Sequence, residues 1–148
     1  MTRLLTLVTL GLAIAVAPSL GETASKRIHV IATVQQQTLT GDPASPKLGD
    51  RLINNVKLFD DSGTQVGTGG AVCTVVSEPP QATVVQCLLS AVFAEGEIVF
   101  GGVASFPVPG AVGHFGILGG TDGFDKARGD ATLTVLSNGN VDSTFDLD

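Results

Sequence analysis

The sequence predicts an all-β protein: one eight-stranded antiparallel β-barrel with a lipocalin-like cavity. After the N-terminal segment, no long stretch has the apolar spacing of a helix, and short apolar strands alternate with turns. Glycine is abundant, at 19 of 148 residues, and glycine pairs within strands suit the bends of a small barrel. Residues 82–93 are largely apolar on both faces. A closed barrel explains this if its lumen is apolar and part of its outer wall is covered. A β-sandwich is the alternative.

Eight segments are expected to form the strands, joined mostly by short connections. Turn sequences separate them, among them Asp60–Gly63, Pro107–Gly110 and the Asn138-Gly139 hairpin signal. The last segment alternates cleanly, with one face made of Val141, Ser143, Phe145 and Leu147. The segments are residues 27–37, 51–59, 64–77, 82–93, 97–106, 111–120, 131–137 and 140–148.

Residues 1–21 are interpreted as a secretory signal peptide, which leaves residues 22–148 as a single domain. Arg3 gives a positive start, and the apolar run Leu4–Ala17 is followed by small and turn-forming residues. This run is short for a membrane span, which needs about 20 residues. We expect cleavage after Gly21, a secreted or extracytoplasmic location, and no stable membrane insertion afterwards. A membrane-tethered N-terminus is the alternative.

The charge balance argues against a nucleic-acid partner. The chain has 8 Lys and Arg against 14 Asp and Glu, a formal net charge of −6. This charge opposes binding to phosphate backbones and to anionic membranes. The chain also has no Trp and no Tyr, so we expect no aromatic surface that stacks on sugars or bases.

Cys73 and Cys87 are predicted to form a disulfide. Two cysteines in an exported protein favour this pairing, and the turn sequence Glu78–Gln81 lies between them. Folding the chain back around this turn places residues 73 and 87 opposite each other on one face of the paired strands. A metal site is the competing interpretation, but the distant His29 and His114 do not give ligand spacing. We expect no metal and no other cofactor.

Residues 119–133, GGTDGFDKARGDATL, interrupt the run of strands. Two glycines would end a strand with a tight turn, and Thr121 and Asp122 can bond backbone N–H groups in a turn or helix cap. We expect Lys126–Arg128 to form one helical turn. The segment is therefore a structured connection between two strands, and its structural turn residues are Gly119, Gly120, Phe124 and Gly129.

This segment is similar to a signature of the dirigent proteins, roughly Gly-Gly-Thr-Gly-x-Phe-x-x-Ala-Arg-Gly, and of the related allene oxide cyclases. Asp122 departs from the pattern, because it replaces a glycine. Leu48–Asp50, Lys57–Phe59 and the glycine and cysteine pattern of Gly67–Val76 resemble the cyclases in the same order. The resemblance covers roughly residues 37–147. The residues that match the signature are Gly119, Gly120, Thr121, Phe124, Ala127, Arg128 and Gly129.

The resemblance implies an eight-stranded antiparallel barrel, commonly trimeric, with an elongated hydrophobic cavity. In the cyclases, a glutamate, two asparagines and a Ser-Pro pair act around a bound epoxide. Ser45 and Pro46 match the Ser-Pro pair, but the glutamate position falls on Gln37, and the asparagine positions fall on Leu39 and near Val56. Gln37 carries no charge and cannot act as a carboxylate. We therefore do not expect true allene oxide cyclase activity.

Dirigent proteins instead steer the coupling of phenoxy radicals that a separate oxidase makes. Arg128 matches the arginine of that family, and Asp122 lies next to a position where some members carry aspartate. The family tyrosine is absent, and Ile28–Gln37 contains no acidic residue. Arg128 also suits a simpler role, in which it bonds to carbonyl groups of its own turn.

Polar residues in the expected second strand complete the candidate site. Asn54 and Asn55 are adjacent, so one of them must face inward if the strand is regular. A polar group in an apolar lumen would orient a ligand. The expected ligand-binding residues are Gln37, Ser45, Pro46, Asn54 and Asn55, and the catalytic candidates are Gln37 and Arg128.

Three functional hypotheses follow. In the first, a secreted barrel binds a small hydrophobic molecule in its lumen and guides its cyclisation or coupling by confinement, as an isomerase-like, cyclase-like or dirigent-like protein. In the second, the barrel is a non-enzymatic carrier of hydrophobic ligands or an envelope binding module. In the third, the barrel is filled and its outer surface binds a partner. A homo-oligomer, a trimer by resemblance, is expected.

Overall fold

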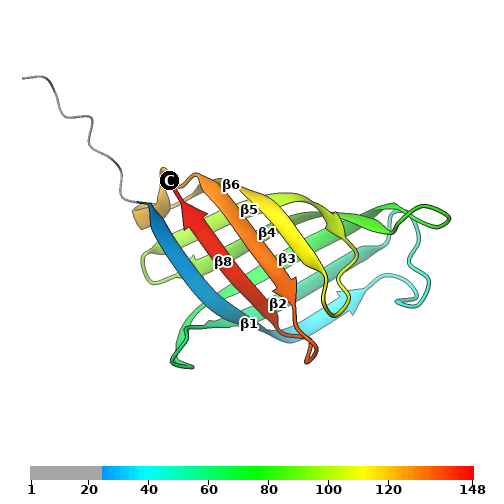
Figure 1. Cartoon of the computed structure of the whole chain (residues 1–148), viewed down its shortest axis with the longest axis horizontal. Helices are drawn as coiled ribbons and strands as arrows, with labels where there is room; N and C mark the ends of the chain where they lie inside the picture. The colour runs from blue at the N-terminus through cyan, green and yellow to red at the C-terminus, as the bar shows by residue number, and fades with distance from the viewer. Residues whose placement is uncertain (1–24) are drawn as a thin grey trace, which may run out of the picture.

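The computed structural model describes residues 25–148, which form eight β-strands and one short 3-10 helix, η1 (Figure 1). The predicted signal peptide, residues 1–21, and its cleavage site lie outside the described residues. The elements are β1 (Lys26–Leu39), β2 (Arg51–Phe59), β3 (Gln65–Ser77), β4 (Val84–Phe93), β5 (Gly96–Ser105), β6 (Val112–Gly120), η1 (Asp122–Phe124), β7 (Gly129–Val135) and β8 (Val141–Leu147).

The strands form one closed barrel. Each strand pairs with the next along the chain, and β8 pairs with β1. All eight pairings are antiparallel. This confirms the predicted eight-stranded antiparallel barrel and excludes the β-sandwich, which needs two separate sheets. Closure leaves no free edge strand, although β5 and β6 pair only between Ile98–Gly101 and Gly116–Gly120.

β4 shows why residues 82–93 are apolar on both faces. Successive side chains of a strand point to opposite faces. Val85, Cys87 and Ala91 are buried inside the barrel, whereas Leu88 and Val92 are 56% and 42% exposed on the outer wall. The inner set packs the interior, and the outer set faces solvent in the single chain.

The two ends of the barrel differ. At one end lie the chain termini of β1 and β8 and the connections β2–β3, β4–β5 and β6–β7, with η1 beside the C-terminus (Figure 1). Phe124 of η1 is buried there, and the Nζ of Lys26 lies 5.0 Å from the centre of its ring. We call this the closed end. The opposite end, which carries the other four connections, is called the open end.

Aromatic packing extends from Phe124 into the middle of the barrel. The ring centres of Phe93 and Phe124 are 5.9 Å apart, and those of Phe93 and Phe145 are 6.3 Å apart. Phe100 then packs edge-to-face on Phe145 at 5.1 Å and on Phe115 at 6.2 Å. Tilted and edge-to-face pairs are the favourable arrangements of aromatic rings. These five side chains fill the closed half of the interior.

The segment after β6 differs from the sequence-based expectation in two details. The helical turn covers Asp122–Phe124 rather than Lys126–Arg128, because burial of Phe124 determines where the chain turns. The Thr121 hydroxyl does not cap this turn; it accepts a hydrogen bond from the Glu97 backbone N–H at 3.1 Å and ties the segment to β5. Gly129 restarts the strand as predicted. Its φ is +121°, and a Cβ at this position would collide with the carbonyl oxygen of Asp146.

The predicted disulfide is confirmed. Cys73 and Cys87 are direct partners in the β3–β4 register and are bonded to each other. Their Cα atoms are 4.0 Å apart. In the chain-entropy model, a cross-link that closes a loop of this length stabilises the fold by about 3 kcal/mol.

A small polar cluster crosses the β1–β8 seam on the outer wall. His29 of β1 lies between two carboxylates, with Nδ1 2.5 Å from Asp61 and Nε2 3.2 Å from Asp142. The hydrogen bond to Asp61 is the main reason that the pKa of His29 is raised above its ordinary value of 6.5, with a smaller contribution from Asp142. When protonated, both ring nitrogens can donate at once.

Across residues 25–148, no helix combines the length and the apolar character that crossing a bilayer requires.

Phe124→Ala should lower the free energy of unfolding by about 3–5 kcal/mol, because the truncation opens a cavity in the closed end. Urea denaturation with the disulfide intact measures this. Phe106→Ala is the matched control, because Phe106 is a half-buried phenylalanine at the open end and should cost less. Equal losses for the two variants would contradict the structural role of η1.

His29 should stabilise the barrel in a pH-dependent way. Since its folded-state pKa is raised, its contribution is fully present below about pH 6.5, the unfolded-state value, and is lost as pH rises through the folded-state pKa. The Tm difference between the wild type and His29→Gln should therefore be largest near pH 6 and shrink toward pH 9. A difference that stays constant over this range would contradict the assignment.

Candidate functional site

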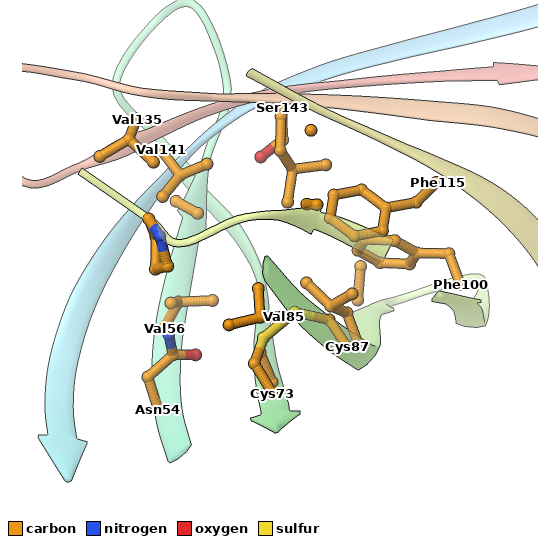
Figure 2. A pocket seen from close by; sticks show the side chains of 18 of the residues that line it. Asn54, Val56, Cys73, Val85, Cys87, Phe100, Phe115, Val135, Val141 and Ser143 are labelled. Atoms are coloured by element: carbon orange, nitrogen blue, oxygen red, sulfur yellow. A yellow bond between two sulfur atoms is a disulfide. The ribbon is translucent and has the colours of Figure 1, made fainter. Parts of the chain in front are cut away.

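An apolar cavity of about 120 Å³ occupies the open half of the barrel interior (Figure 2). All eight strands contribute to its wall, and Pro107 and Ala111 of the β5–β6 connection border it at the open end. Phe100, Phe115 and Phe145 form its floor, where the aromatic packing of the closed half ends. Engineered apolar cavities of roughly 150 Å³ hold a benzene molecule, so this cavity is about the size of one ring.

The disulfide is part of the cavity wall. Cys73 and Cys87 both line the cavity and are 6% and 7% exposed. The cross-link holds β3 to β4 beside Val85, as Figure 2 shows. It therefore stiffens this side of the cavity wall.

Two polar side chains project into the cavity from the strands. Asn54 lies between inward-facing Leu52 and Val56 on β2, and Ser143 lies beside Phe145 on β8. In Figure 2, the Asn54 carboxamide and the Ser143 hydroxyl both point toward the cavity. Ser90 and Ser105 also border the cavity, but strand alternation turns their side chains to the outer wall.

Asn54 and Ser143 are free to bind a ligand. Within residues 25–148, no side-chain hydrogen bond involves either residue. No sealed polar side-chain atom in this part of the chain lacks a partner, so the Ser143 hydroxyl must reach the open volume of the cavity. Both groups can donate and accept a hydrogen bond.

The cavity wall contains no ionisable side chain, since its two cysteines are joined in the disulfide. In residues 25–148, no group of three His, Cys, Asp or Glu is placed to hold a metal ion. The wall can exclude water, orient a molecule and form two neutral hydrogen bonds. It offers no side chain that exchanges a proton near neutral pH.

The structure separates the two asparagines expected at the site. Asn54 faces the cavity, and Asn55 is exposed on the outer wall. Gln37 is the direct register partner of Asn54 across β1 and β2, which places it on the same face of the sheet. Its side chain is nevertheless exposed at the rim of the open end and does not line the cavity.

The remaining candidates lie farther from the cavity. Ser45 and Pro46 are in the β1–β2 connection at the open end; Ser45 is exposed, Pro46 is half-buried, and neither lines the cavity. Arg128 is at the closed end, where its guanidinium Nη1 donates to the carbonyl of Ala127 at 2.7 Å. Arg128 therefore has the simpler of its two expected roles, in which it bonds to a carbonyl group of its own turn.

Ser143 is the functional candidate that the sequence-based analysis did not select. The clean alternation of the last strand did place it on the face of Phe145 and Leu147, which the structure shows to be the inner face. A serine on an otherwise apolar face was therefore the available signal. This signal could be interpreted only with the knowledge that the inner face of the last strand borders a cavity.

Comparison with known proteins identifies the architecture. No family model matches the sequence, and no curated protein matches it significantly. A pyocyanin demethylase aligns with 83% of this chain and 100% of its own, at 23% identity and a TM-score of 0.72. The exo-specific intermolecular Diels-Alderase AbnU aligns with 84% of this chain and 98% of its own, at 16% identity and a TM-score of 0.72.

A second Diels-Alderase, AbmU from Streptomyces koyangensis, aligns with 82% of this chain and 63% of its own, at 14% identity and a TM-score of 0.67. At identities this low, the TM-scores establish a shared fold and no more. The likeness to allene oxide cyclases and dirigent proteins rests on the sequence motifs alone. In architecture, the chain is an eight-stranded barrel similar to those of the pyocyanin demethylase and the two Diels-Alderases.

Proposed function

We propose that this protein binds one small, largely apolar molecule in the barrel cavity and promotes its cyclisation or coupling by confinement. The observation that carries the proposal is the apolar cavity at the open end, whose strands project only two polar side chains into it. Ligand sites are commonly concave and apolar, with a few polar groups that fix orientation. The closed end is filled by phenylalanines, so a ligand would enter at the open end.

Ring closure by cycloaddition suits a wall without ionisable groups. In such a reaction, three π bonds become two σ bonds and one π bond, and no atom leaves, so no acid or base is needed. Holding the reacting carbons together supplies up to about 7–11 kcal/mol in well-oriented model reactions. A hydrogen bond from Asn54 or Ser143 to a carbonyl of the substrate would lower the barrier further.

The structural neighbours support this class of reaction. Two of them are described as Diels-Alderases, and another is described as a heme-binding cyclase that catalyses a [4 + 2] cycloaddition. The segment from Gly119 to Gly129 resembles the dirigent and allene oxide cyclase signature in sequence, and its residues build the closed end here. The cavity volume favours one molecule that closes on itself over two that couple.

A non-enzymatic carrier is the second candidate. The observation that favours it is the same wall without ionisable groups, since storage and transport need no chemistry. Turnover distinguishes the two candidates, whereas binding does not.

The site of action is proposed to be outside the cytoplasm. The Cys73–Cys87 disulfide supports this, because disulfides persist in oxidising compartments. The apolar segment Leu4–Ala17, which resembles the core of a signal peptide, supports it as well.

Self-association is proposed through the outer wall of β4, β5 and β6. Leu88, Val103 and Leu118 are 56–60% exposed there. A Cβ built on Gly101 would lie 3.3 Å from a methyl carbon of Leu118 and 3.7 Å from one of Leu88, so both leucines border the same glycine. Glu97 is the only Asp, Glu, Lys or Arg at the outward positions of these three strands. A chain with a net charge of −6 can pack against its own copies through such a face without burying like charges.

Leu118→Lys should dissociate this assembly without unfolding the barrel, because Leu118 is exposed in the single chain and a buried unpaired ammonium is unfavourable. Sedimentation velocity at micromolar concentration measures the change in mass. Thr33→Lys, on the outer wall of β1, is the matched control, because β1 pairs with β2 and β8 and not with β4, β5 or β6; it should leave the mass unchanged. A wild type that sediments as a monomer would contradict the proposal.

Native mass spectrometry of the protein exported by its own host tests the function. We expect one small neutral guest per chain, released on denaturation. Ala71→Phe should lack the guest, because residue 71 lines the cavity and the ring would fill it. The disulfide should still form in this variant.

Incubating the empty wild type with the guest or its acyclic precursor then separates enzyme from carrier. A cyclised product would support catalysis, and unchanged guest would support a carrier. Wild-type protein that carries no guest and binds no apolar probe would contradict both, and it would favour a barrel that acts only through its outer surface.

A further inference from the structure

We infer that the ligand is a neutral molecule with two separate polar groups joined by an apolar ring: one group meets Ser143 at the floor of the cavity, and the other meets Asn54 near the open end. This inference rests on the proposed function, because it names the class of molecule that the same cavity takes. Three features of the cavity carry it.

The first feature is the separation of the two polar side chains. Ser143 is paired with Val30 of β1, and Asn54 is paired with Gln37 of β1, seven residues farther along the same strand. Both side chains nevertheless line the same cavity of about 120 Å³, so one molecule that fills the cavity can contact both. Figure 2 shows the two groups on opposite sides of the cavity. One ligand atom therefore cannot bond to both.

The second feature is what lies between them. Leu52, Val56 and the disulfide line the wall near Asn54, and the phenylalanine rings of Phe100 and Phe145 line it near Ser143. The side chains between the two polar groups are apolar, and they contact a ligand without hydrogen-bonding to it. The part of the ligand between its two polar groups is therefore apolar, and the volume of about 120 Å³ suits one ring.

The third feature is the absence of charge in the lining. An ionised group buried in an apolar site is strongly unfavourable unless an opposite charge pairs with it. Ser143 is 4% exposed, so a carboxylate or ammonium beside it would have little water and no counter-ion. Because the serine hydroxyl and the asparagine amide each donate and accept, hydroxyl and carbonyl groups of a ligand fit equally well.

Four probes built on one benzene ring test this inference by titration calorimetry at pH 7. They are toluene, 4-hydroxybenzyl alcohol, p-toluate and 4-methylbenzylammonium. We expect the wild type to bind toluene and 4-hydroxybenzyl alcohol. We expect binding to the anion and to the cation to be at least about 10-fold weaker than to the alcohol, because neither charge has a partner in the cavity.

Ser143→Ala and Asn54→Leu should each weaken the binding of 4-hydroxybenzyl alcohol by about 3- to 10-fold, which is the contribution of one neutral hydrogen bond. Neither variant should weaken the binding of toluene, because toluene has no polar group. Thr144→Ala and Asn55→Leu are the matched controls, since both positions face the outer wall, and they should leave all four affinities unchanged. If Ser143→Ala fails to melt cooperatively, Ser143→Cys takes its place. Its thiol is close in size to the hydroxyl but forms only weak hydrogen bonds.

The outcomes separate this inference from the proposed function. Binding of toluene together with unchanged alcohol affinity in both cavity variants would overturn the inference and leave the proposed function standing. Anion or cation binding as tight as alcohol binding would do the same. If no probe binds to the wild type, the proposed function and this inference are overturned together.

Discussion

Pairing between β1 and β8 closes the sheet into a barrel, and the cavity exists because of that closure. The two strands pair over the whole stretch from Lys26 to Ala32. Inside the seam, Val30 and Phe145 are among the most buried side chains of the molecule; outside it, His29 bonds to Asp142. Apolar burial and polar contacts thus hold the same strand pair from opposite faces. An open sheet of these strands would expose two edges and an apolar inner face to water.

Closure alone does not make a binding site, because a small barrel can be filled completely by its own side chains. Five of the seven phenylalanines pack against one another, from Phe124 at the closed end to Phe115 at the cavity floor. Smaller side chains, such as Ala32, Ala71 and Ala104, line the other half. The uneven distribution of side-chain volume leaves one half solid and the other hollow. The solid half stabilises the barrel, and the hollow half is available to a ligand.

The chemistry open to the hollow half follows from a wall that has no ionisable side chain and two neutral polar ones. A wall without ionisable groups is suited to reactions in which bonds rearrange within one bound molecule. The disulfide keeps β3 and β4 together where they border the cavity, and a rigid wall is what confinement requires. In the proposed function, Asn54 and Ser143 orient the ligand at two points. The proposed catalysis and the proposed ligand class both depend on one apolar interior with two polar side chains.

The barrel, its strand segments and the Cys73–Cys87 pairing could be predicted from sequence, because strand periodicity, turn residues and cysteine spacing are local signals. The sequence also indicated that one of Asn54 and Asn55 faces inward. The packed barrel shows that it is Asn54, because Asn54 shares the inner face of β2 with buried Leu52 and Leu58. The same holds for Arg128, whose motif suggested a site residue but whose place is the closed end. A cavity is a property of how all eight strands share volume, and no local pattern encodes where that volume is left empty.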